Sequence, residues 1–167
     1  MSRVLQHELS LYNKNKILNN YPEYTIEIED NNLYIWNVRI HTFDSSSKLA
    51  NEMEAYEHQH GQGYVWLCFH FPHNYPKDPP FIYVKSPKLM GDYIHRGAIC
   101  ANFLMNGKEG GWSTDITIEC LIVQLRQLLI DSNPFIMNPT KKDEWSEIEA
   151  RTAYKGINAI HTNWSKK

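Results

Sequence analysis

One cysteine, Cys100, stands out as a residue that could carry covalent chemistry. It lies in the segment "YIHRGAICANFLMNGKEGGW", residues 93–112, which is mostly small or apolar and ends on Trp112. A thiolate is both a strong nucleophile and a metal ligand, while an unreactive cysteine packs as a small apolar side chain. The residue types alone therefore leave three interpretations of Cys100 open: a buried core residue, a metal ligand and a nucleophile.

The spacing of the cysteines and histidines argues against a metal site. Cys68, Cys100 and Cys120 are far apart, and no Cys-x-x-Cys pair or close cluster of cysteine and histidine occurs. Structural zinc sites depend on such spacing, so we expect none here. His58 and His60 lie in a polar stretch that we interpret as a solvated loop. Because the cysteines are odd in number and no secretory signal is present, we expect reduced thiols and a cytoplasmic or nuclear location.

The composition is that of a soluble globular protein. The chain has 167 residues, of which 42% are hydrophobic and 22% charged, so it can bury a sizeable core. The formal net charge of −2 provides no general basic surface for nucleic acid. No apolar run is long enough to span a bilayer, and the N-terminus is amphipathic rather than a signal sequence. We expect a monomer with a single domain, residues 1–167, that binds neither nucleic acid nor membrane.

The hydrophobic pattern predicts a helix followed by four strands. Apolar residues recur at helical spacing over residues 3–16, and Ser2 could cap this helix. Alternating or continuous apolar runs predict four strands, at residues 24–29, 33–40, 64–71 and 81–85. Consecutive strands joined by short turns favour an antiparallel meander. Helices segregated against such a sheet define the α+β class.

Residues 44–63 interrupt the series of strands. This stretch is polar, with serines at its start and glycines at its end, and it predicts an inserted loop with a short helix. Leu49, Met53 and Tyr56 would form the apolar face of that helix. The sequence suggests no function for this insertion.

The second half of the chain combines a long irregular stretch with helices. Residues 87–116 show no periodicity, and such a stretch within a compact domain is usually functional. Residues 117–130 predict a helix with a broad apolar face and Thr117 as its cap. On that helix we interpret Cys120 as structural. The tail over residues 143–164 predicts one or two further helices.

Four pieces of sequence resemble, in this order, the ubiquitin-conjugating enzyme family. They are Tyr75-Pro76 with Pro79-Pro80, Gly97-Ala98-Ile99-Cys100, Trp112-Ser113 with Thr117, and Asn133-Pro134. The segments "RVLQHELSLY", "LYIWNVRI", "NYPKDPPFIYV" and "GGWSTDITIECLIVQL" resemble the Q-type branch of that family. The resemblance implies the family fold, with an N-terminal helix, a four-stranded antiparallel meander and C-terminal helices.

The same resemblance implies that Cys100 is a nucleophile. In the family reaction, a cysteine accepts ubiquitin from the ubiquitin-activating enzyme as a thioester and passes it to an acceptor. The activating enzyme uses ATP, so no cofactor is implied for this chain. The alternative is a catalytically silent ubiquitin-binding variant of the fold that acts as an interaction module, although silent variants lack the cysteine. An unrelated cysteine hydrolase would need a histidine base and an orienting residue, for which the sequence offers no recognised order.

Three departures from the common members of the family concern the acceptor chemistry. The His-Pro-Asn tripeptide is missing, and Met90 and Asp92 stand at the positions of its histidine and asparagine. Asn102 stands where many members carry aspartate, and Phe135 and Ile136 stand where lysine-directed members often place an acidic residue. The first and third departures also occur in the Q-type branch, which is linked to hydroxyl acceptors. The resemblance implies the same tolerance here.

Without the asparagine, another donor must stabilise the oxyanion of the tetrahedral intermediate. Loss of such a donor typically costs about 2.7–4 kcal/mol. Tyr93 and His95 are candidates, because the Q-type branch has a tyrosine just before its approach to the cysteine. His161 and Trp164 resemble a histidine–tryptophan pair of that branch, and His161 could act as a general base. A surface position for His95 and a helix-packing role for His161 and Trp164 remain alternatives.

The resemblance also implies partner surfaces. Arg3 and Gln6, on the first helix, would dock the activating enzyme and often a ubiquitin ligase. His73 and Asn74 would complete the ligase site, but common members carry a bulky apolar residue in that loop, so the polar His73 argues against ordinary RING ligases. The alternative is a solvated helix face and a proline-rich turn. Gly97 would suit a close approach by the ubiquitin tail.

Overall fold

The computed structural model describes residues 2–18, 23–107 and 110–164, with the side chains of residues 160–164 outside that description. The elements in chain order are α1 (Arg3–Leu18), β1 (Tyr24–Glu29), β2 (Asn32–Ile40), α2 (Lys48–His60), β3 (Val65–His70), β4 (Phe81–Ser86), β5 (Leu89–Met90), β6 (Ile94–His95), β7 (Ala98–Ile99), the short 3₁₀ helix η1 (Asn102–Leu104), α3 (Ile118–Asp131), β8 (Phe135–Ile136) and α4 (Glu147–Trp164).

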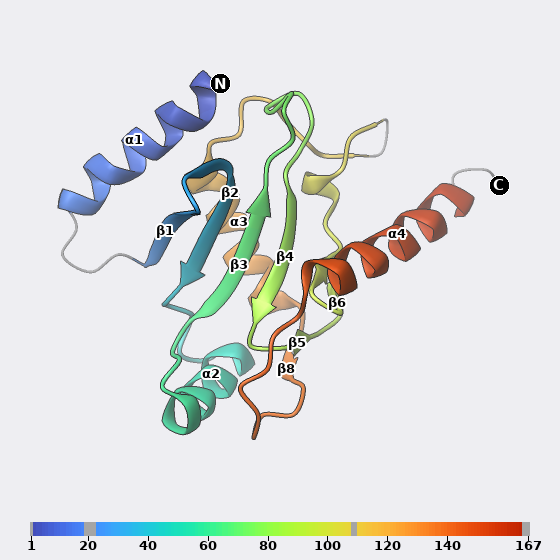
Figure 1. The fold of residues 1–167 in the computed structure, drawn as a ribbon. Coiled ribbons are helices and arrows are strands. Elements are labelled where there is room, and N and C mark those ends of the chain that lie inside the picture. Colours follow the sequence, from blue (N-terminus) through green and yellow to red (C-terminus); the bar gives the residue numbers. More distant parts are fainter. Residues whose placement is uncertain (1, 19–22, 108–109, 165–167) are drawn as a thin grey trace.

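The central sheet is the antiparallel meander that the sequence predicts. Strands β1, β2, β3 and β4 pair in order, and β7 and β6 extend the sheet beyond β4 (Figure 1). Strands β5 and β8 form a separate two-stranded sheet. The α+β prediction is therefore confirmed. The extra strands within residues 87–116 escaped sequence analysis because two-residue strands are too short to show a period of two.

Alternation along the strands directs one face of the sheet toward α3. In β2, Trp36, Val38 and Ile40 are all fully buried, and their neighbours in β3, Leu67 and Phe69, are buried too. Helix α3 lies on this face (Figure 1). Its buried residues recur at helical spacing: Ile118, Leu121, Ile122, Leu125 and Leu129. Each such side chain contributes about 1.5–3 kcal/mol by leaving water, so this layer is the main core.

Side-chain caps hold the helix ends. Ser2 Oγ accepts a hydrogen bond from a backbone N–H of α1, and Thr117 Oγ1 accepts one from Cys120 N at 3.2 Å, as expected. Glu8 Oε2 accepts from Ile118 N at 3.1 Å and so ties α1 to the start of α3. The prediction that Cys120 is structural was wrong, because its side chain is exposed. It lies about 200° around the helix from Ile118 and faces away from the sheet.

The insertion at residues 44–63 is more ordered than predicted. It forms a 13-residue helix, α2, in which Ser47 Oγ accepts from Ala50 N at 3.1 Å and Gly61 ends the helix at φ +69°. The predicted apolar face is buried: Leu49, Met53 and Tyr56. His58 and His60 lie in the last turn of α2 rather than in a loop. The glycine at the C-terminus and the serine at the N-terminus are the cap residues that bound a regular helix.

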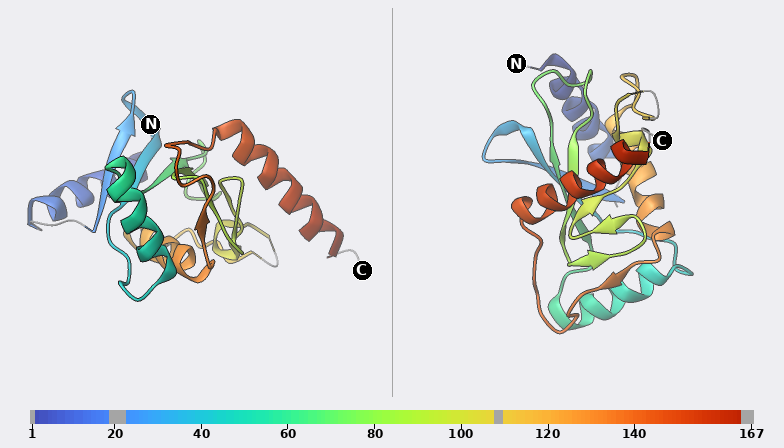
Figure 2. Two further views of the ribbon diagram at one scale, coloured as in Figure 1. Left: turned by 90° about the horizontal axis from the view of Figure 1, so that it is seen from below. Right: turned by 90° about the vertical axis from the view of Figure 1, so that its right-hand side faces the viewer.

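Helix α4 crosses the opposite side of the sheet. Figure 2 shows α3 and α4 on opposite sides, with α4 over the end formed by β4, β7 and β6. Tyr154 packs edge-on against Phe81, with ring centroids 5.5 Å apart, and the Arg151 guanidinium lies 4.2 Å from the centroid of the same ring. None of the described helices combines the length and the hydropathy needed to cross a membrane.

Candidate active site

Cys100 lies directly after β7, at the start of the loop that leads to η1. Its thiol is half-buried, whereas Cys68 is only 2% exposed and Cys120 is exposed at the surface. Partial burial raises the pKa of the Cys100 thiol above its ordinary value. Among the described residues, no group of three His, Cys, Asp or Glu side chains could hold a metal ion.

The backbone around Cys100 is fixed by its buried neighbours. Ala98, Ile99 and Ala101 are all buried, and Cys100 N donates a hydrogen bond to Tyr93 O at 2.9 Å. Strand β7 is paired on both sides, with Tyr83 of β4 opposite Ala98. The sulfur therefore reaches the surface from a rigid part of the sheet.

The turn between β6 and β7 requires its glycine. Arg96 and Gly97 both have positive φ, +48° and +84°, as in tight hairpin turns. A Cβ on Gly97 would lie 2.9 Å from Val84 O and 3.0 Å from Trp145 Cβ. Gly97 O also accepts from Val84 N at 2.8 Å. Gly97 thus packs inward against β4, so the hairpin itself accounts for this glycine without an approaching ubiquitin tail.

The hairpin register separates the two candidate oxyanion donors. Ile94 pairs with Ile99, and the hydrogen bond from Cys100 N to Tyr93 O continues this register, so Tyr93 lies opposite Cys100. His95 pairs with Ala98 and is the diagonal neighbour of Cys100. Opposite residues of an antiparallel pair share a face and are closer than diagonal ones. At 46% exposure, Tyr93 is the better placed of the two.

The candidate base lies at the end of α4. The helix continues through His161 and Trp164, which confirms only that both residues are helical. Their side chains lie outside the described residues, so their predicted roles stay predictions. Arg3 and Gln6, the predicted docking residues, lie on the exposed surface of α1.

The sequence pieces that carry the family resemblance contact one another. Trp112 Nε1 donates to Pro76 O at 2.9 Å, and the Trp112 and Tyr75 ring centroids are 6.0 Å apart. Gly111 N donates to Asn102 O at 2.8 Å. The loop after Cys100 is therefore fastened to the proline-rich segment, which explains why a tryptophan closes the stretch.

Asn74 is engaged within the protein. Its Nδ2 donates to Asp78 Oδ2 at 2.5 Å, and the other oxygen of Asp78 accepts from Asn106 Nδ2 at 2.6 Å. Asp78 thus clamps the proline-rich loop to the loop that follows Cys100. Sequence analysis missed this carboxylate, because nothing in "KDPP" indicates a partner 28 residues away.

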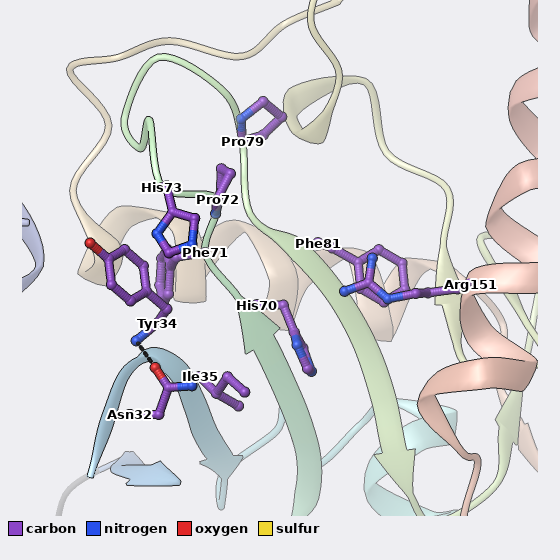
Figure 3. Close-up of a pocket in the computed structure, with 10 residues that line it drawn as sticks. All are labelled: Asn32, Tyr34, Ile35, His70, Phe71, Pro72, His73, Pro79, Phe81 and Arg151. Atoms are coloured by element: carbon purple, nitrogen blue, oxygen red, sulfur yellow. Dashed lines mark hydrogen bonds between the residues drawn. The ribbon is translucent and has the colours of Figure 1, made fainter. Parts of the chain in front are cut away.

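His73, the other predicted ligase contact, lines a pocket of about 420 Å³. Figure 3 shows its ring beside Tyr34, at 4.7 Å between centroids, while Arg151 and Phe81 form the far side of the pocket. Cys100 is not part of the lining. The structure therefore separates His73 from the thiol.

The departures from the common family pattern lie along β5 and β8. Asp92 is exposed, and its N–H donates to Ser132 O at 2.7 Å. A carboxylate only accepts hydrogen bonds, so it cannot replace the asparagine as a donor. Phe135 pairs with Met90 and is 48% exposed, whereas Ile136 is buried at 6%. An apolar surface thus replaces the acidic one.

Comparison with known proteins identifies the family. The profile described as "Ubiquitin-conjugating enzyme" matches residues 4–160, and the chain belongs to this family. It is 34% identical over 139 residues to ubiquitin-conjugating enzyme E2 Q1 of Mus musculus and Homo sapiens, covering 83% of this chain and 32% of theirs. It is 30% identical over 143 residues to the ubiquitin-conjugating enzyme E2 Q-like protein 1 of the same two species, covering 84% of each chain. Within the family, the chain is a member of the Q branch.

The extent of these matches differs. The chain spans about a third of the length of the E2 Q1 proteins, because the match covers 32% of their residues. The solved structure of human ubiquitin-conjugating enzyme E2 G1 superposes with a TM-score of 0.58 at 22% identity, covering 76% of this chain and 92% of that one. This similarity supports the fold.

Proposed function

We propose that this protein accepts ubiquitin from the ubiquitin-activating enzyme as a thioester on Cys100 and transfers it to an acceptor. The observation that carries the proposal is the half-buried Cys100 thiol, which the β6–β7 hairpin holds at the surface in the sequence frame of the family. The activating enzyme would use ATP, and no cofactor is needed on this chain. The cytoplasm or the nucleus, where thiols stay reduced, is the proposed location.

The first step is a thiol exchange. The Cys100 thiolate attacks the carbonyl carbon at the ubiquitin C-terminus, a new C–S bond forms, and the sulfur of the activating enzyme leaves as a thiolate. Because burial raises the pKa of Cys100, only a small fraction is ionised at neutral pH, and a proton must leave before attack. We propose that the Tyr93 hydroxyl donates to the oxyanion, with His95 as the second candidate.

In the second step, the acceptor attacks the thioester carbonyl and Cys100 leaves as a thiolate. A lysine amine, with a pKa near 10.4, must first lose a proton, and Phe135 and Ile136 offer no carboxylate to receive it. We therefore propose that serine, threonine and other hydroxyl groups are among the acceptors. His161, with Trp164 beside it in sequence, is the proposed general base for them.

Partner surfaces follow from the positions of the predicted residues. The exposed start of α1, with Arg3 and Gln6, is the proposed docking site of the activating enzyme. Because His73 contacts Tyr34 and Asn74 is bound to Asp78, we propose weak binding to ordinary RING ligases.

One gel assay tests the proposal. The protein is mixed with activating enzyme, ubiquitin and ATP and run without reductant. A shift by one ubiquitin that reductant and Cys100→Ala abolish, and that the exposed-cysteine control Cys120→Ala retains, supports the thioester. Retained ubiquitin binding without a shift would support the silent interaction module instead. Discharge by free lysine, but not by serine, threonine or glycerol, would refute the hydroxyl acceptors.

A further inference from the structure

Helix α2, which corresponds to no family motif in the sequence, is joined to the segment that follows α3. Three contacts connect its side chains to this segment: Lys48 Nζ to Asn133 Oδ1 at 3.3 Å, Glu52 Oε2 to the Ile136 N–H at 3.2 Å, and His60 Nε2 to the Pro139 carbonyl at 2.7 Å. The buried face of α2 anchors the helix in the core. The insertion therefore rests on rigid structure at one side and holds residues 133–139 at the other.

Glu52 closes the open edge of β8. Strand β8 pairs with β5 along one edge, where Met137 N donates to Lys88 O at 2.8 Å. Because N–H groups alternate between the two edges of a strand, the Ile136 N–H points away from β5. Ile136 is buried, so its N–H would lack a partner without the Glu52 carboxylate. A hydrogen bond to a carboxylate is stronger than one to a neutral acceptor.

Strand β8 is connected in turn to the hairpin of Cys100. Phe135 lies opposite Met90, and Ser132 O accepts from Asp92 N at 2.7 Å. One residue further along, Tyr93 O accepts from Cys100 N at 2.9 Å. A continuous set of backbone contacts therefore leads from the strand that Glu52 holds to the residue that carries the thiol.

We infer that α2 is a brace for the acceptor side of the active site and that Glu52 is a positioning residue for transfer from Cys100. By closing the edge of β8, Glu52 fixes the register in which the exposed Phe135 is presented beside β5. The inference rests on the proposed function, since it assigns a role to β8 in the second step. It gives the insertion at residues 44–63 a task that its sequence does not indicate.

The test separates discharge from charging. Glu52→Ala removes the acceptor of the Ile136 N–H, Glu52→Gln keeps a neutral acceptor oxygen, and Glu54→Ala changes an exposed glutamate on the same helix. Single-turnover discharge of the purified thioester to lysine and to glycerol is measured beside the rate of charging. We expect Glu52→Ala to slow discharge relative to charging by about fivefold to tenfold. Glu52→Gln should recover most of the rate, and Glu54→Ala should match wild type.

Amide hydrogen exchange provides a second readout that needs no ubiquitin. In Glu52→Ala, exchange at Ile136 should quicken by about tenfold, as expected for loss of one hydrogen bond. Equal slowing of charging and discharge, unchanged discharge, or unchanged exchange at Ile136 would each overturn the inference. A wild-type protein that forms no thioester would refute the proposed function, while the exchange measurement would still decide whether Glu52 holds β8.

Discussion

Replacing Gly97 by alanine should destabilise the hairpin that carries Cys100. Gly97 has φ +84°, a backbone conformation that residues with a Cβ disfavour. The added Cβ would also lie 2.9 Å from Val84 O and 3.0 Å from Trp145 Cβ. Both neighbours belong to the packed interior beside β7, so the hairpin must shift to relieve the contact.

The two effects can be estimated separately. A left-handed conformation costs a non-glycine residue about 1–2 kcal/mol, and an extra methyl group in a packed interior adds about 1–3 kcal/mol. Gly97→Ala should therefore lower the free energy of unfolding by about 2–5 kcal/mol. Gly61 is a matched control, because it has φ +69° and no atom within 4 Å of an added Cβ. Gly61→Ala should cost only the first part, about 1–2 kcal/mol.

Urea unfolding of the two variants and wild type measures the difference directly, provided that the slopes agree. We expect Gly97→Ala to be the less stable variant by about 1–3 kcal/mol. Equal stabilities within about 0.5 kcal/mol would refute the steric argument. If Gly97→Ala kept wild-type stability but lost charging with ubiquitin, this glycine would serve the approach of the ubiquitin tail instead.

Three other properties can be tested in the same way. Because burial raises the pKa of Cys100, its alkylation in Cys120→Ala should be slower at pH 7 than that of a peptide cysteine and should keep rising past pH 9; a plateau below pH 8 would contradict this. Trp112→Phe removes the hydrogen bond to Pro76 O and should cost about 1 kcal/mol in urea unfolding; an unchanged midpoint would show that the bond contributes nothing. Thr117→Ala removes the α3 cap and should cost about 1 kcal/mol, which thermal unfolding would fail to show if water replaced the cap.

Much of the fold could be predicted because its signals are local. The alternation that leaves Trp36, Val38 and Ile40 buried is visible in the sequence of β2, and so is the helical spacing of α3. Thr117 caps α3 as expected, because a capping hydroxyl and its N–H partner lie only three residues apart. The frame around Cys100 is also local, since its motif spans four consecutive residues.

The candidate site could be predicted less completely, because its geometry depends on pairing between strands. Nothing in the sequence of residues 87–116 shows that Tyr93 lies opposite Cys100 and His95 does not. That distinction follows from a register of two-residue strands. The exposure of Cys120 was accessible from its position on the helix, about 200° from Ile118, but was missed.

The sequence by itself determined where helices and strands form, which faces are apolar, and which cysteine stands in the family's motif. These properties depend on residues within a few positions of one another, where backbone preference and hydrophobic period act. Only the tertiary structure decided that Asp78 joins two loops, that Gly97 packs against Trp145, and that Glu52 closes β8. Such contacts join residues tens of positions apart, and they form only when the whole core has brought those segments together.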